Sequence, residues 1–248
     1  MAEALDLDYL ADVAGQGFEN MSSNEVAVPR LLIAQAMSDV VQNGSVKVGH
    51  FYNSISGKDY GDSIRVIVCH FQKVWVVWKP DQGGYVGTFP IGGLEDVTGD
   101  NYTGMKWKNE DGILCDVIET WNYLVVLPDH PEDGYMVFGS TRGNLKYLKG
   151  WNTQMRYLRT PQGKPAPLFS AIWNMSTGKD QNKKGNTYYS CNKEGKSSIV
   201  MEGWVPKAVY TEYVVPARDV ADKAIALVDN SQDVAAIEDK SDEEPSEF

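Results

Sequence analysis

Ile64-Arg-Val-Ile-Val-Cys-His70 and Val74-Trp-Val-Val-Trp78 are the two runs that decide the fold of this chain. Both consist mostly of β-branched and aromatic residues, which fit the pleated surface of a sheet. A short polar link separates them, so we predict a β-hairpin. Trp75 and Trp78 stand three residues apart, so we expect their side chains to face opposite sides of the strand.

Similar short apolar segments recur along the chain, separated by Gly- and Pro-rich turns. We predict further strands at 46–55, 113–127, 135–139, 168–175, 186–192 and 197–204. The stretch 95–111 reads as a polar surface excursion, and 176–185 as a polar loop. This pattern is typical of a mainly β fold, either an OB-like barrel or a β-rich domain with one inserted helix and elaborated loops.

One internal segment, 142–159, has the spacing of an amphipathic helix. Ser140 and Thr141 precede it and could cap its N-terminus. The apolar stripe comprises Leu145, Leu148, Trp151, Met155 and Leu158. Two further helical segments are expected near the C-terminus, at 206–213 and 217–228.

The bulk composition limits the class of protein. The chain has 248 residues, of which 42% are hydrophobic, and three widely spaced cysteines. No run approaches the ~18 apolar residues of a transmembrane helix, and the acidic N-terminus lacks the features of a secretory signal. We therefore expect a cytoplasmic protein, in the host cytoplasm if viral, with reduced thiols and no membrane partner.

Charge is distributed unevenly, although the net charge is −11. The terminal segment Asp219–Phe248 holds ten acidic and two basic residues, whereas residues 142–196 hold eleven basic residues and two acidic ones, Asp180 and Glu194. A basic segment inside an acidic protein indicates a polyanionic partner, which the net charge alone would have argued against.

Aromatic residues are interleaved with the bases of this segment, as in a groove that binds a single nucleic-acid strand. Cations neutralise phosphates, and flat side chains stack on unpaired bases. Some of these aromatic side chains could equally fill the core, and the basic helix face could be ordinary solvated surface. The candidate DNA-binding residues are Arg142, Lys146, Lys149, Arg156, Tyr157, Arg159, Trp173, Lys183, Lys184, Tyr188 and Tyr189.

The C-terminal run Asp242-Glu243-Glu244-Pro245-Ser246-Glu247-Phe248 is expected to be disordered, because it cannot bury enough apolar surface. With the β-rich core and the basic segment, it resembles phage replication proteins that coat single-stranded DNA. These have an OB-fold core and an acidic tail ending in Phe. The resemblance implies that Asp242, Glu243, Glu244, Glu247 and Phe248 bind replication proteins such as a polymerase or helicase–primase.

We accordingly divide the chain into an acidic N-terminal arm (1–25), a β-rich nucleic-acid-binding domain (26–216), a C-terminal helix (217–230) and a disordered acidic tail (231–248). The expected function is sequence-nonspecific binding of single-stranded DNA in phage replication or recombination, with the tail competing for the groove. DNA versus RNA preference and a homo-oligomer stay open.

No catalytic motif emerges from the sequence. The Gly178–Gly185 string lacks the Lys of a phosphate-binding loop, and His50, His70 and His130 lack zinc-ligand spacing. We therefore expect no enzyme, no metal and no cofactor. Two alternatives stay open: a virion structural or host-interaction protein that mimics DNA, and an enzyme acting on nucleic acid.

Overall fold

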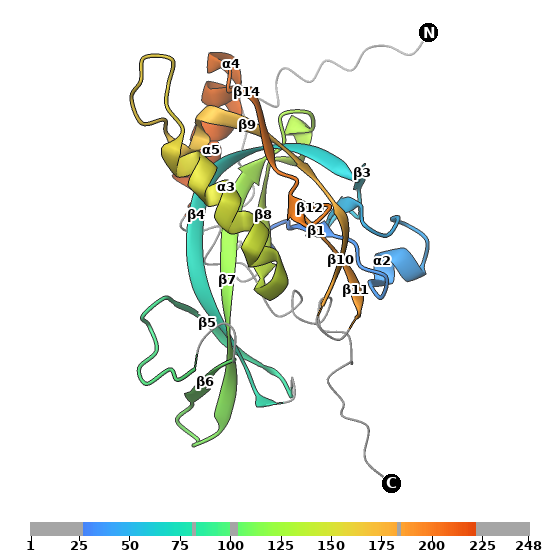
Figure 1. The fold of residues 1–248 in the computed structure, drawn as a ribbon, viewed down its shortest axis with the longest axis vertical. Coiled ribbons are helices and arrows are strands. Elements are labelled where there is room, and N and C mark those ends of the chain that lie inside the picture. The colour runs from blue at the N-terminus through green and yellow to red at the C-terminus, as the bar shows by residue number, and fades with distance from the viewer. Residues whose placement is uncertain (1–26, 81–82, 100–103, 183–184, 222–248) are drawn as a thin grey trace, which may run out of the picture.

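Two long antiparallel strands, β4 (Ser63–Trp78) and β7 (Leu114–Val126), pair with each other in the largest sheet of the fold. In this computed structural model the described residues are 27–221, except 81–82, 100–103 and 183–184 (Figure 1). The predicted hairpin within 64–79 is wrong, because β4 is one continuous strand of 16 residues. Its polar link does not turn, since Gln72 and Lys73 pair with Asn122 and Trp121 of β7.

Each long strand has a different neighbour at each end, which divides the sheet into a body and an arm. In the body, β9 (Ala171–Ser176) pairs with the first half of β4, β14 (Val200–Trp204) pairs with β9, and β8 (Tyr135–Thr141) pairs with β7. In the arm, β5 (Tyr85–Pro90) pairs with the end of β4, and β6 (Met105–Lys108) pairs with the start of β7. Strand β6 lies within the expected polar excursion 95–111. The arm extends away from the body at the bottom of Figure 1.

Smaller sheets flank the body. One contains β1 (Leu31–Ile33), β2 (Phe51–Asn53) and β3 (Asp59–Gly61), with the short helix α2 (Asp39–Gln42) after β1. The others are the hairpins β10–β11 (Gly178–Gln181, Thr187–Ser190) and β12–β13 (Asn192–Lys193, Lys196–Ser197). Strand β10 corrects the expectation of a loop over 176–185. The mainly β class is confirmed, and the pairings describe open sheets with no closed barrel shown among the described residues.

The predicted internal helix is confirmed as α3 (Leu145–Tyr157), preceded by the 3₁₀ turn η4 (Arg142–Asn144). Its apolar stripe packs on one face of the body sheet, where Trp151 contacts Tyr123 and Trp173 in the main core. The predicted cap is wrong, because Ser140 and Thr141 belong to β8 and Asn144 occupies the N-cap position.

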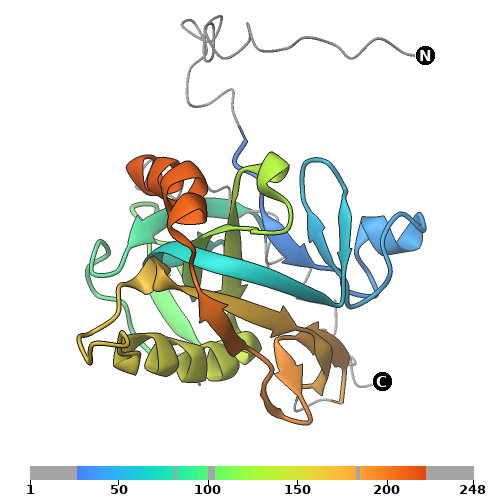
Figure 2. The same ribbon diagram turned by 90° about the horizontal axis from the view of Figure 1, so that it is seen from above.

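The C-terminal helical segment covers the opposite face of the sheet, as Figure 2 shows on the other side of β4 from α3. It comprises α4 (Lys207–Val209), the π-helical turn η6 (Tyr210–Val214) and α5 (Val215–Asp219). The wide turn precedes Pro216, which cannot donate a backbone hydrogen bond. The described start of the expected helix 217–230 belongs to a helical segment that begins at Lys207, and residues 222–230 lie outside the described part. The N-terminal arm and the acidic tail lie outside the described residues.

Short 3₁₀ turns complete the fold at η3 (Pro131–Asp133) and η5 (Leu168–Ser170). Cys69, Cys115 and Cys191 are buried and free, as expected for reduced thiols. No helix within 27–80, 83–99, 104–182 or 185–221 is long and apolar enough to cross a bilayer.

Candidate nucleic-acid interface

The exposed face of α3 carries a row of cations. Lys149 and Arg156 are exposed seven residues apart, about 10 Å along the helix axis at 1.5 Å per residue. Arg159 is exposed just beyond the helix end, where its Nη1 donates to the Leu158 carbonyl oxygen. Within the described part of the chain, none of these three side chains forms an ion pair. Their charges are therefore available to an anionic partner.

Tyr157 adds an aromatic ring to this row. Its side chain is 67% exposed, the most exposed aromatic residue among the described ones. It lies next to Arg156 in the sequence and two residues before Arg159. An exposed phenol ring near basic side chains can stack on an unpaired base while the cations contact phosphates.

Lys146 lies at the other end of α3, and its charge is already balanced. Its Nζ lies 2.8 Å from Oδ2 of Asp180 on β10. The hydroxyls of Tyr147 and Tyr188 donate to the same oxygen at 2.7 and 2.9 Å. The candidates Lys146 and Tyr188 therefore meet at one carboxylate that joins α3 to the β10–β11 hairpin.

The contacts within this cluster shift the pKa values of Asp180, Tyr188 and Lys146. Burial alone would raise the pKa of Asp180, but the hydrogen bonds from Lys146, Tyr147 and Tyr188 outweigh it and lower the pKa to about 2. Burial, and then the hydrogen bond to Asp180, raises the pKa of Tyr188 to about 12. The hydrogen bond to Asp180 also raises the pKa of Lys146. At neutral pH the cluster thus holds one cation and one anion.

Two aromatic candidates lie away from the α3 row. Trp173 is only 1% exposed and packs edge-on against Trp151 in the main core, so it cannot stack on a base in this fold. Tyr189 lies opposite Lys179 in the β10–β11 pairing, one position along from Asp180 and Tyr188, and so faces the other side of the hairpin. There its ring covers Gly49, a position where even a Cβ atom would clash.

Other candidates cannot be placed. Lys183, Lys184 and the side chain of Arg142 lie outside what the structure describes, as do the expected partner-binding residues Asp242, Glu243, Glu244, Glu247 and Phe248.

The structure adds residues that the sequence shortlist missed. Lys193 and Lys196 are exposed and paired across the β12–β13 hairpin, which contacts α3. Trp204 is 40% exposed and pairs with Ala171, a residue of the core beneath α3, so it lies on the α3 side of the sheet. Only the basic composition of 142–196 pointed to the lysines, and no sequence signal distinguished Trp204 from a core residue.

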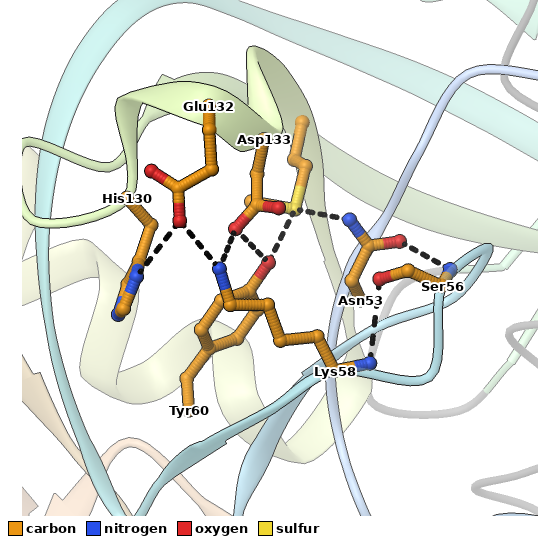
Figure 3. Close-up of polar contacts among 8 residues, drawn as sticks. Asn53, Ser56, Lys58, Tyr60, His130, Glu132 and Asp133 are labelled. Carbon is orange, nitrogen blue, oxygen red and sulfur yellow. Dashed lines mark hydrogen bonds and ion pairs between the residues drawn. The ribbon is translucent and has the colours of Figure 1, made fainter. Parts of the chain in front are cut away.

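A second polar cluster joins β3 and Lys58 just before it to the loop after β7 (Figure 3). Nζ of Lys58 lies 2.7 Å from Oε1 of Glu132 and 2.8 Å from Oδ2 of Asp133. The hydroxyl of Tyr60 donates to the same Asp133 oxygen at 2.9 Å. Nδ1 of His130 lies 3.5 Å from Oε1 of Glu132.

His130, Glu132 and Asp133 have the ligand types and spacing of a cation site. The Lys58 ammonium, however, lies between the two carboxylates where a metal ion would bind. This contact raises the pKa of Lys58 and lowers that of Glu132. Burial raises the pKa of Tyr60 to about 12. The cluster therefore acts as a structural clamp for the loop that contains η3.

Comparison with known proteins places the chain among phage proteins. Residues 2–225 match the model of the Pam3 phage gp34-like protein family. Because the match covers most of the chain, the protein belongs to this family. No curated protein and no solved structure matches it.

Proposed function

We propose that this phage protein binds single-stranded DNA without sequence preference and acts in replication or recombination. One observation carries the proposal: Lys149, Arg156 and Arg159 are exposed cations without acidic partners among the described residues, and the exposed ring of Tyr157 lies in the same last turn of α3 as Arg156. Phosphate neutralisation and base stacking are the two contributions that nonspecific single-strand binding requires.

The revised interface consists of residues on α3 and around it. Lys149, Arg156 and Arg159 contact the phosphates of the DNA backbone, and Lys193 and Lys196 extend the positive surface. Tyr157 is the main stacking residue. Lys146 and Tyr188 contribute indirectly by holding α3 against the β10–β11 hairpin through Asp180. Lys183 and Lys184 stay candidates from their sequence position alone.

The acidic tail is proposed to have two roles. A polyanionic segment tethered to the protein competes with DNA for the basic row at a high effective concentration. Once DNA displaces it, the tail is free to bind replication proteins through Phe248 and the acidic residues before it.

Fluorescence titration of the full chain with a dT oligonucleotide at two or more salt concentrations tests the proposal. We expect binding that weakens steeply with salt, with a slope of about −0.7 in log K against log salt for each phosphate contact. A mixed-sequence oligonucleotide should bind similarly. Absence of binding at low salt, or binding that ignores ionic strength, would contradict the proposal.

The alternative is a virion structural or host-interaction role without nucleic-acid binding. The observation in its favour is the arm, where Tyr85, Ile91 and Leu114 are exposed apolar residues. Exposed apolar residues that form a contiguous patch are typical of protein-binding surfaces. The same titration separates the two functions, because the alternative predicts no binding of the oligonucleotide at low salt.

A further inference from the structure

The sheet face that carries the C-terminal helical segment continues beyond it. Side chains along β4 and β7 alternate between the two faces. On the α5 face, the first cross-strand pairs are Ile67 with Val126 and His70 with Leu124. The next three pairs towards the arm are Gln72 with Asn122, Val74 with Thr120 and Val76 with Ile118. Val214, Ala217 and Ala221 pack on Ile67, Leu124 and Val126. The side chains of the three pairs from Gln72–Asn122 to Val76–Ile118 form the surface that we call the lower sheet face.

Most side chains of the lower sheet face are buried. Val76, Thr120 and Asn122 are 0% exposed. Their apolar neighbours form a cluster of four residues, Val74, Val76, Trp78 and Ile118, all on β4 or β7. The described part of the chain contributes no side chain from outside the sheet to this cluster. A sheet face becomes buried only when a second layer packs on it, so this face has a covering layer.

Two polar side chains on this face lack partners. Both amide atoms of Asn122 and the hydroxyl of Thr120 are buried without a hydrogen bond to any described residue. Burying such groups unpaired is costly. A peptide segment lying on the face would offer N–H and C=O groups to the Asn122 amide, which needs one donor and one acceptor.

Two undescribed segments begin beside this face. The C-terminal one leaves from Ala221, which is buried against the sheet. The apolar stripe Val214, Ala217, Ala221 continues at helical spacing with Ile225 and Val228. The N-terminal segment joins before Val28, where only Val26 and Ala27 are apolar and the four residues preceding them, Ser22-Ser23-Asn24-Glu25, are polar. The apolar pattern therefore favours the C-terminal segment.

We propose that residues 222–228 dock on the lower sheet face, with Ile225 and Val228 against Val74, Val76 and Ile118. This docking fixes the root of the acidic tail to the body of the protein. The inference does not depend on DNA binding, since it follows from burial of the sheet face and the apolar pattern of the segment.

Hydrogen–deuterium exchange of the full chain tests the docking with a matched pair of variants. Ile225→Asp places a charge in the apolar stripe, and Ala226→Asp places the same charge beside it. We expect Ile225→Asp to speed amide exchange in 72–78 and 116–122 by about tenfold or more, the effect of losing one buried Ile side chain. Ala226→Asp should leave exchange there close to wild type. Equal effects of the two variants would overturn the proposal.

Photo-crosslinking provides a second measurement, which reports the position of the segment directly and does not rely on a change in amide exchange. Benzoylphenylalanine replaces Val228 in the full chain, and mass spectrometry locates the crosslinks. The proposal requires crosslinks to peptides within 72–78 or 116–122. Crosslinks elsewhere, or none, would overturn it. Crosslinks between light and heavy isotope-labelled chains would show that a second copy covers the face. Faster exchange in Leu10→Asp but not in Ile225→Asp would assign the face to the N-terminal segment.

Discussion

Lys146 and Asp180 join α3 to β10 through an ion pair, with 2.8 Å between Nζ and Oδ2. The same carboxylate oxygen accepts hydrogen bonds from Tyr147 and Tyr188. One of the two acidic residues of the basic segment is thus used to fix the helix, whereas Lys149 and Arg156 form no ion pair with any described residue. The helix thus carries both a cation fixed in a structural contact and cations that are candidates for DNA binding.

Replacing this carboxylate should destabilise the protein in a pH-dependent way. The pKa of Asp180 is about 2 in the fold against 3.8 ordinarily. A lowered pKa stabilises the fold above pH 3.8, and that stability is lost as the pH falls through 2. Because the Lys146 side chain is 54% exposed, we expect Asp180→Asn to cost only about 1–2 kcal/mol at pH 7.

Urea denaturation of wild type and Asp180→Asn between pH 7 and pH 2 measures this effect. The difference in unfolding free energy between the two proteins should shrink below pH 4. Comparison of the two removes the contribution of other carboxylates with lowered pKa values, such as Asp129 and Glu132. A difference that is constant with pH would mean that the charge of Asp180 does not stabilise the fold.

Charge reversal on α3 should weaken oligonucleotide binding and flatten its salt dependence. The double variant Lys149→Glu/Arg156→Glu removes two proposed phosphate contacts, so the slope of log K against log salt should fall in magnitude by about 1.4. Lys79→Glu/Lys108→Glu makes the same charge change with two exposed lysines of the arm. Equal weakening in both variants would indicate a general charge effect and no localised interface.

The two aromatic candidates Tyr157 and Trp173 should respond in opposite ways. Tyr157→Ala removes an exposed ring, so we expect little change in stability but a loss of about 1–3 kcal/mol in oligonucleotide binding. Trp173→Ala leaves a cavity beside Trp151 and should cost about 3–5 kcal/mol in unfolding free energy. Thermal denaturation and titration of both variants separate core from interface. Unchanged binding in Tyr157→Ala would remove it as a stacking residue.

Sequence patterns predicted the strands and the helix better than their connections. The β-branched runs around 64–78 and 114–126 correctly indicate strands, and the stripe in 145–158 correctly indicates α3. The expected turn at Gln72-Lys73 is wrong because a neighbouring strand pairs with these polar residues. There the Lys73 ammonium lies 4.9 Å from the Trp121 ring, a contact between distant segments that local sequence does not reveal.

The candidate site was predictable in composition but not in geometry. The basic character of 142–196 identified α3, yet residues of one sequence segment point in different directions. Trp173 alternates into the core with Ala171 and Met175, and Lys146 pairs with an acid 34 positions away. Which aromatic side chains face outward depends on strand pairing and helix packing. Those are tertiary features, so the sequence could name candidates without assigning them to a face.

The clamp formed by Lys58 predicts that the protein needs no metal at His130, Glu132 and Asp133. Since the ammonium lies between both carboxylates, EDTA should leave the melting temperature of wild type unchanged. In Lys58→Met the two carboxylates lose their counterion, and millimolar Ca²⁺ or Mg²⁺ should then raise the melting temperature. Differential scanning fluorimetry measures the melting temperature of wild type with and without EDTA, and that of Lys58→Met with and without Ca²⁺ or Mg²⁺. A lower melting temperature of wild type in EDTA would show that a metal binds in spite of Lys58.

Deletion of Asp239–Phe248 tests the proposed competition between the acidic tail and DNA. The deleted peptide carries five acidic residues and one basic residue, Lys240, and a tethered polyanion lowers the apparent affinity of a basic surface for DNA. The shortened chain should therefore bind a dT oligonucleotide more tightly than the full chain at low salt. The difference should narrow at high salt, where both interactions are screened. A full-length variant with the five acids replaced by Asn or Gln separates charge from length and should match the deletion. Equal affinity of all three proteins would show that the tail does not compete for the interface.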